Sequence, residues 1–196
     1  MQSPVKALLD ANVLYPNHLR NLLLQLAQND LFEVKWSGQI EEEWLRNMEP
    51  RTRARIEAHT LPLIRKGFPD AIVTGFDPNQ VIGKTDVKDR HVASAAAAIA
   101  PCILVTNNLR DFDFEALKTL GVQVQSPDDF LTELAISKPE VMEAATREAA
   151  ANLTKSNPTW EDYLTLLATG CGLPKYVDCL RAGPGAAPAT APSKAT

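Results

Sequence analysis

Short apolar segments alternate with longer segments of helical periodicity through the first two thirds of the chain. The apolar segments, each expected to form a strand, are residues 6–9, 32–36, 71–75, 102–106 and 122–125. Strands that alternate with helices are typical of a parallel sheet whose two faces are covered by helices. We therefore predict an α/β fold with three layers (α/β/α) and a central parallel sheet of four to five strands.

Between the expected strands, the sequence predicts helices over residues 19–28, 39–48, 52–66 and 88–100. Pro62 should start, kink or interrupt the third of these helices. After Pro127 the pattern changes to helices alone, over residues 128–136, 139–153, 158–169 and 174–180. We predict three parts: an α/β domain (1–137), a helical C-terminal extension (138–182) and a disordered tail rich in Gly, Pro and Ala (183–196).

Composition limits the class of protein without suggesting a nucleic-acid ligand by itself. The 196 residues include 20 Lys and Arg against 24 Asp and Glu, a net charge of −4. The three cysteines have no metal-ligand spacing, and no window approaches the roughly 20 apolar residues of a membrane span. We expect a reduced, cytoplasmic protein that does not enter the membrane.

The positive charge is unevenly distributed along the chain. One cluster is Arg46, Arg51, Arg53, Arg55, Arg65 and Lys66, and a second is Lys84, Lys88, Arg90 and His91. Such clusters could bind a phosphate backbone even on an acidic protein. An ordinary solvated helical face explains them equally well.

Acidic residues recur where strands of the predicted sheet end. Asp10 directly follows the apolar segment 5–9, and the carboxyl ends of parallel strands form the usual ligand crevice of such sheets. Asp89 shares a helical stripe with Ala93 and Ala96, which predicts a partly buried carboxylate. The alternative for Asp89 is an ordinary acid in the first turn of a helix, a position where Asp86 is expected to act as the N-cap.

Two more segments should reach the same edge of the sheet. Polar residues 106–111 follow the strand 102–106, and Glu43 lies near the start of a helix that follows the strand 32–36. A lone glutamate on a helix usually faces solvent. Carboxylates from three βα units, without a histidine or cysteine cluster, would nevertheless form an all-oxygen site suited to Mg²⁺ or Mn²⁺. Hard cations held in this way promote phosphoryl chemistry.

Four motifs in order resemble those of the PIN domains, and more narrowly of the VapC-like toxins of bacterial toxin–antitoxin pairs. They are LLDANVLY (8–15), WSGQIEEE (36–43), DVKDRHV (86–92) and TNNLRDF (106–112). The resemblance covers roughly residues 5 to 131 and implies a PIN-like fold. It also implies a metal-dependent endoribonuclease that leaves a 5′-phosphate and a 3′-hydroxyl.

The resemblance assigns roles to particular residues. Asp10, Glu43 and Asp89 match the family's metal-binding and catalytic acids. Asn108 stands where a fourth acid is common and supplies no charge, which leaves either one or two metal sites open. Asp111 could compensate as a catalytic acid or could instead cap the turn before Phe112. Asn12 and Thr106 would orient carboxylates or waters, and Arg90 and Arg110 are the candidates in sequence for clamping RNA phosphates.

The resemblance also implies partners. A toxin of this type has a small antitoxin that covers or disrupts the acidic site, and the family resemblance also suggests a homodimer. Residues 138–182 resemble the extension of one VapC-like subgroup, with NPTWEDYL (157–164) and GLP (172–174) as the similar segments. A stripe on that extension, Trp160, Tyr163, Leu164 and Leu167, is expected either to pack against the α/β domain or to dock an antitoxin or second subunit.

Two other functions fit parts of the pattern. The chain could be a PIN-fold binding or regulatory module that has lost catalysis, which Asn108 leaves open. It could also be a phosphatase similar to the haloacid dehalogenases, whose nucleophilic aspartate also ends a first strand. Those enzymes usually carry a second aspartate two residues later, where this chain has Asn12.

Overall fold

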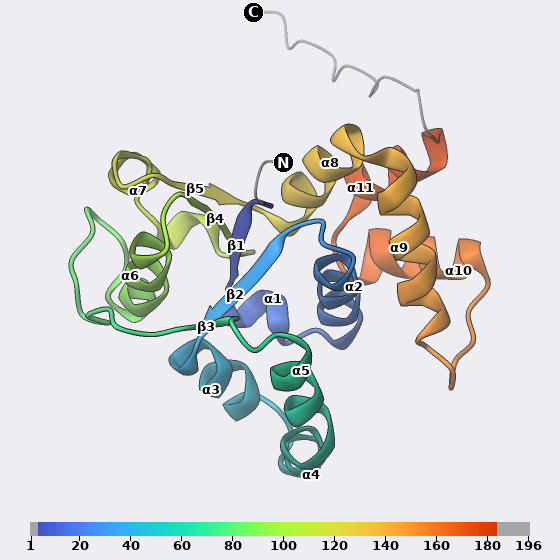
Figure 1. The fold of residues 1–196 in the computed structure, drawn as a ribbon, viewed down its shortest axis with the longest axis horizontal. Helices are drawn as coiled ribbons and strands as arrows, with labels where there is room; N and C mark the ends of the chain where they lie inside the picture. The colour runs from blue at the N-terminus through green and yellow to red at the C-terminus, as the bar shows by residue number, and fades with distance from the viewer. Residues whose placement is uncertain (1–3, 184–196) are drawn as a thin grey trace, which may run out of the picture.

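The computed structural model describes residues 4–183, and its centre is a five-stranded parallel sheet (Figure 1). The strand order is β3-β2-β1-β4-β5, and all four pairings are parallel. The strands are β1 (Lys6–Leu9), β2 (Glu33–Ser37), β3 (Ile72–Val73), β4 (Cys102–Val105) and β5 (Val122–Gln125). The predicted α/β class and the five expected strands are confirmed.

The sheet is covered on both sides, and its central strand is apolar on both faces. Ala7, Leu8 and Leu9 of β1 have no exposed surface, as expected for a central strand of a parallel sheet. Figure 1 shows α6 (Arg90–Ala98) and α7 (Phe114–Thr119) on one side of the sheet, with α2 (Asn17–Gln28) on the other. This PIN-like arrangement brings the carboxyl ends of β1 and β4 together at one edge.

Several short elements at that edge were not predicted. They are α1 (Ala11–Leu14), the 3-10 turns η2 (Val87–Asp89) and η3 (Leu109–Asp111), and the six-residue helix α7. The expected helix over residues 88–100 is wrong at its start, because Asp89 ends the 3-10 turn and α6 begins at Arg90. Asp86 is the expected cap: its side chain accepts a hydrogen bond from the Lys88 N–H and so closes the 3-10 turn.

The helix expected around Pro62 is one continuous helical segment with a change of pitch. It comprises α4 (Pro50–Arg55), a π-helical turn η1 (Ile56–Thr60) and α5 (Leu61–Gly67), and it follows α3 (Gly38–Arg46). Proline lacks the N–H that an α-helix would use, and a wider π turn before it accommodates the missing bond. Ile56 and Leu61 are buried and anchor the segment to the core.

The C-terminal part consists of helices that pack on the α/β part. They are α8 (Pro127–Ser137), α9 (Pro139–Ala151), α10 (Trp160–Thr165), the π turn η4 (Leu166–Gly170) and α11 (Pro174–Ala182). α9 packs against α2, where the Asn21 side chain donates to the Ala149 carbonyl at 2.8 Å. Tyr163, Leu164 and Leu167 are buried, and α10 contacts α9 and η4, so these three side chains pack inside the protein and are not a docking surface.

Two expectations about the ends of the extension stay predictions. The boundary near residue 137 separates α8 from α9, yet α8 packs closely on α11. The tail expected to be disordered lies, from residue 184 on, outside the described residues. Between residues 4 and 183, no helix has the length and apolar character needed to cross a membrane.

Candidate active site

Asp10 lies at the carboxyl edge of the sheet, where the ends of β1 and β4 come together as predicted. Asp10 follows β1 and donates its backbone N–H to the Val105 carbonyl of β4 at 3.1 Å. One carboxylate oxygen, Oδ2, accepts hydrogen bonds from the Thr106 hydroxyl and the Asn12 amide, both at 2.6 Å. The other oxygen accepts the Ala11 N–H at 2.6 Å, which caps α1. These bonds fix the orientation of a carboxylate that is only 3% exposed.

Asn12 and Thr106 therefore stand where the sequence predicted them, as orienting groups around Asp10. Asn12 Nδ2 also donates to Thr106 Oγ1 at 3.1 Å, and Asn12 Oδ1 accepts the Asn107 N–H at 3.0 Å. Burial raises the pKa of Asp10, although the hydrogen bonds from Thr106 and Ala11 oppose this shift, and the negative charge of Glu43 adds to it. A carboxylate held this firmly is preorganised to receive a cation.

Asp89 is the second buried carboxylate. It is 9% exposed, and its Oδ2 accepts no hydrogen bond from any described residue. Burial, reinforced by the negative charge of Asp10, raises the pKa of Asp89 to about 7 in spite of Lys88, whose Nζ lies 3.9 Å from Oδ2. A buried carboxylate oxygen without a donor is costly unless a cation binds it.

Glu43 comes from the third βα unit and is more exposed. Its helix α3 is capped by Ser37, and the buried Trp44 ring of α3 lies beneath the Arg20 guanidinium, 4.8 Å from Cζ to the ring centroid. Glu43 Oε2 lies 3.4 Å from His91 Nε2. His91, which the sequence suggested only as part of a basic cluster, is thus a neighbour of the site.

The structure distinguishes Glu43 from the two glutamates before it. Glu41 is buried, accepts a hydrogen bond from the Trp36 indole at 3.2 Å and pairs with Arg65, so its role is structural. Glu42 is exposed. The three glutamates differ only in their tertiary contacts, which the local sequence does not reveal. The sequence could therefore select Glu43 only through the family resemblance.

The position expected to carry a fourth acid has a different arrangement. Asn108 donates its backbone N–H to Thr106 Oγ1 at 3.0 Å and its side-chain amide to Asp111 Oδ2. Lys88 Nζ lies 2.7 Å from the same Asp111 oxygen. The hydrogen bonds from Lys88 and Asn108 hold the pKa of Asp111 below its usual value. Asp111 is therefore paired with the ammonium group of Lys88, a contact that the sequence did not reveal.

The acids share one open cavity of about 380 Å³. It is lined by Asp10, Asn12, Glu43, Lys88, Asp89, Asn107 and Asn108. Asp111, Arg90 and Arg110 are not among its lining residues, so the structure does not bring the two candidate phosphate clamps into it. The donor set of carboxylate and amide oxygens fits a hard divalent cation, and the Asp89 oxygen that accepts no hydrogen bond from the described residues is a candidate ligand for such an ion.

In this structure the three acids do not form a preformed set of metal ligands. Among residues 4–183, no three His, Cys, Asp or Glu side chains form a ready-made group that could hold a metal ion. Carboxylates of like charge repel, and each acid here takes its own neighbour: Asp10 binds Thr106, and Glu43 approaches His91.

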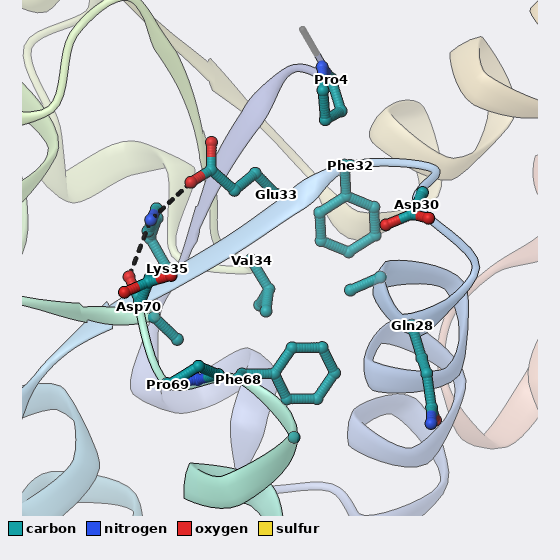
Figure 2. Close-up of a pocket in the computed structure, with 13 residues that line it drawn as sticks. Pro4, Gln28, Asp30, Phe32, Glu33, Val34, Lys35, Phe68, Pro69 and Asp70 are labelled. Carbon is teal, nitrogen blue, oxygen red and sulfur yellow. Dashed lines mark hydrogen bonds and ion pairs between the residues drawn. The ribbon is translucent and has the colours of Figure 1, made fainter.

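A second cavity lies at the opposite edge of the sheet, where β2 begins (Figure 2). Its walls include Phe32, Val34 and Phe68, and its volume is about 270 Å³. Lys35 Nζ there lies 2.7 Å from both Glu33 Oε1 and the Asp70 carbonyl, as the dashed lines in Figure 2 show. Because its lysine is already paired and it is remote from the acids, we do not place the active site there.

The sheet topology and the acids at its carboxyl edge are those of a PIN-like domain with additional C-terminal helices. Comparison with known proteins agrees. The family model described as the VapC50 C-terminal domain matches residues 127–182. Over 135 residues the chain is 27% identical to the "Putative ribonuclease VapC50" of Mycobacterium tuberculosis (strain ATCC 25618 / H37Rv), covering 68% of this chain and 74% of that protein. No solved structure matches significantly.

The resemblance inferred from the four motifs is thus supported by two independent parts of the chain. The family model matches only the C-terminal helices, whereas the 135-residue alignment is too long to lie within them. The chain is similar to the VapC-like PIN-domain ribonucleases in both parts.

Proposed function

We propose that the chain is a metal-dependent endoribonuclease that hydrolyses RNA phosphodiester bonds. The observation that supports this proposal is the shared cavity, which Asp10, Glu43 and Asp89 from three βα units line and in which an oxygen of buried Asp89 accepts no hydrogen bond from any described residue. The similarity to a protein named as a ribonuclease supports the choice of RNA as substrate.

In the proposed mechanism, Asp10, Glu43 and Asp89 hold Mg²⁺ or Mn²⁺ directly or through water. When bound, such an ion supplies a water of lowered pKa and stabilises a leaving oxyanion. Thr106 and Asn12 keep the Asp10 carboxylate in one orientation. In-line attack by water would leave a 5′-phosphate and a 3′-hydroxyl, with no covalent intermediate on the protein.

We further propose that one metal ion suffices. Asn108 supplies no charge, and Asp111 is engaged by Lys88 and Asn108, which leaves three carboxylates for the cation. The Lys88 ammonium, which lines the cavity, adds a positive charge on the side where a fourth acid would bind a second ion. Asp111 is then a residue that positions Lys88 and is not a metal ligand.

The proposed biological role is that of the toxin in a toxin–antitoxin pair, restrained by a small antitoxin protein. The similarity to VapC50, in both the alignment and the C-terminal family model, supports this role. A homodimer and a cytoplasmic location remain predictions from the family resemblance.

The main alternative is a PIN-fold binding module without catalysis. The loss of a fourth acid and the Lys88–Asp111 pair favour it, because both reduce the negative charge available to a metal. A phosphatase of the haloacid dehalogenase type is disfavoured, because Asn12 donates a hydrogen bond to Asp10 where that class has a second carboxylate.

The test compares adjacent glutamates on α3. Purified wild-type protein, Glu43→Gln and Glu42→Gln are incubated with total RNA and Mn²⁺ or Mg²⁺, with EDTA controls and analysis of the fragment ends. We expect wild type and Glu42→Gln to give the same metal-dependent fragments with 5′-phosphates, and Glu43→Gln to give none. Equal inactivity of all three, with bound antitoxin excluded by mass spectrometry, would support the non-catalytic alternative.

A further inference from the structure

The arginines near the acidic edge differ from those of the C-terminal helices in their partners. Arg147 and Arg181 on the C-terminal helices pair with Glu143 and Glu161, at 2.8 and 3.1 Å. Arg46, Arg51 and Arg55, on α3 and α4, are exposed and form no ion pair with any residue from 4 to 183. We refer to these last three residues as the basic stripe.

Helix geometry places the stripe on the outer surface. Arg51 and Arg55 are four residues apart and so lie on the same face of α4. Ile56, directly after Arg55, is buried and marks the face of this helical segment that packs on the core. Arg53, between the two, points elsewhere and pairs with Glu57 at 2.7 Å. The arginines of this segment thus divide into one that is paired within the helix and two that are free at its surface.

The stripe begins beside the candidate active site. Arg46 follows Glu43 by three residues on α3, and side chains at that spacing are neighbours on a helix surface. The chain then turns over residues 47–49 and enters α4, which Figure 1 shows immediately after α3. Arg46 is therefore close to the cavity that Glu43 lines, and Arg51 and Arg55 lie on the helix that follows.

The charge of this region opposes that of the whole chain. Residues 46–66 contain six Lys or Arg and two Glu, whereas the full chain carries a net charge of −4. Free arginines four residues apart repel each other, so the arrangement destabilises the isolated helix. A bound anion would remove that repulsion, and the planar guanidinium is the side chain best suited to phosphate.

We propose that the basic stripe binds backbone phosphates of the RNA strand that flanks the scissile bond. This inference rests on the proposed nuclease function and identifies the surface that holds its substrate. It assigns a role to Arg46, Arg51 and Arg55, none of which lines the cavity, and it explains why an acidic protein would leave these arginines without carboxylate partners.

Binding can be separated from cleavage by working in the full-length Glu43→Gln background with Mg²⁺. The probe is a fluorescein-labelled single-stranded RNA of mixed sequence and about 20 nucleotides, and the readout is the Kd from anisotropy between about 50 and 200 mM NaCl. The test variant adds Arg51→Gln and Arg55→Gln. The matched control adds Lys138→Gln and Lys155→Gln, which removes the same charge from exposed, unpaired lysines of the C-terminal part.

If the stripe contacts two phosphates, the slope of log Kd against log salt should fall by about 1.4 in the arginine variant, with at least about tenfold weaker binding at the lowest salt. The lysine control should retain the parent slope. An unchanged slope in the arginine variant overturns the inference. So does a result in which that variant keeps its RNA affinity and loses a bound protein partner, because the stripe would then be a protein interface.

Failure of the inference can be told from failure of the proposed function. Wild-type protein is assayed in parallel for metal-dependent cleavage. Cleavage together with stripe-independent binding overturns the inference and leaves the nuclease proposal standing. Stripe-dependent binding without any cleavage supports the stripe as an RNA surface and contradicts the nuclease proposal.

Discussion

A buried aspartate at the carboxyl edge of the sheet and one in the C-terminal helices differ in their hydrogen-bond partners. In the helical part, buried Asp128 accepts the N–H groups of Lys175 and Tyr176 at the start of α11, and Lys175 pairs with Asp129 at 2.5 Å. At the sheet edge, buried Asp89 has an oxygen with no donor in the described chain. Satisfied polar groups stabilise a fold, whereas unsatisfied ones cost stability and are retained where function uses them.

The contrast predicts that replacing Asp89 affects activity far more than stability. Asp89→Asn should lower metal-dependent cleavage at least about 100-fold, because even groups that only support a metal ligand are worth about 10- to 100-fold. The metal-free variant should be no less stable than wild type at pH 8, since it removes a buried charge. Cleavage rates and urea unfolding measure both effects. Asp178→Asn, an exposed acid on α11, is the control and should change neither.

The converse holds for Asp128. Asp128→Ala should lower the free energy of unfolding by about 2 kcal/mol, because two backbone N–H groups at the start of α11 lose their acceptor. The rate of cleavage per folded molecule should stay within about twofold of wild type. This change is much smaller than the tenfold change in rate that corresponds to about 1.4 kcal/mol of activation free energy. A large loss of activity in protein that is still folded would break the division between the two regions.

A pH profile sharpens the comparison at Asp89 itself. Because the folded-state pKa of Asp89 is raised to about 7, the folded chain binds a proton there that the unfolded chain has released. Stability contributed by protonated Asp89 is present at low pH and is lost as pH rises through the interval from about 4 to about 7. In metal-free buffer, wild type should lose about 1 to 3 kcal/mol relative to Asp89→Asn across this interval.

Added Mn²⁺ should reverse that loss, because the ion binds the deprotonated carboxylate. The measurement is urea unfolding of both proteins at several pH values, with and without Mn²⁺. Parallel stability curves for wild type and Asp89→Asn would show that Asp89 titrates normally and that its burial has no energetic consequence.

The smallest expected effect concerns the missing fourth acid. Asn108→Asp should raise Mn²⁺ affinity a few-fold, or about 1 kcal/mol, by adding a carboxylate to the cavity wall. The gain is limited because Lys88 is close enough to neutralise the new charge. Calorimetric titration with Mn²⁺ measures affinity and stoichiometry, with the exposed Asn79→Asp as the control.

Much of the fold could be predicted because strands of a buried parallel sheet are short apolar segments. All five strands were located from the positions of these segments, although β3 is shorter than predicted, and Asp10 and Thr106 follow from where two of the strands end. The short elements were missed for a physical reason: α1 has four residues and η2 three, too few to show a helical period. Capping and tertiary contacts determine such elements.

The sequence predicted three acids that the structure brings to one cavity, but it did not predict their contacts. The motifs identified Asp10, Glu43 and Asp89, but nothing local indicates that Lys88 binds Asp111 or that His91 approaches Glu43. These contacts join segments that are far apart in sequence or on different helices. The buried role of Glu41 likewise depends on Trp36 and Arg65, which only the folded chain brings together.

The most direct test of the account is to locate the metal. Crystals of the full chain grown with Mn²⁺ would be measured at the manganese absorption edge to give an anomalous difference map. We expect one peak per chain, in the cavity between Asp10, Glu43 and Asp89, with Lys88 still paired to Asp111. Active protein that binds manganese elsewhere, or shows no peak among these three carboxylates, would contradict the claim that this edge of the sheet is the catalytic centre.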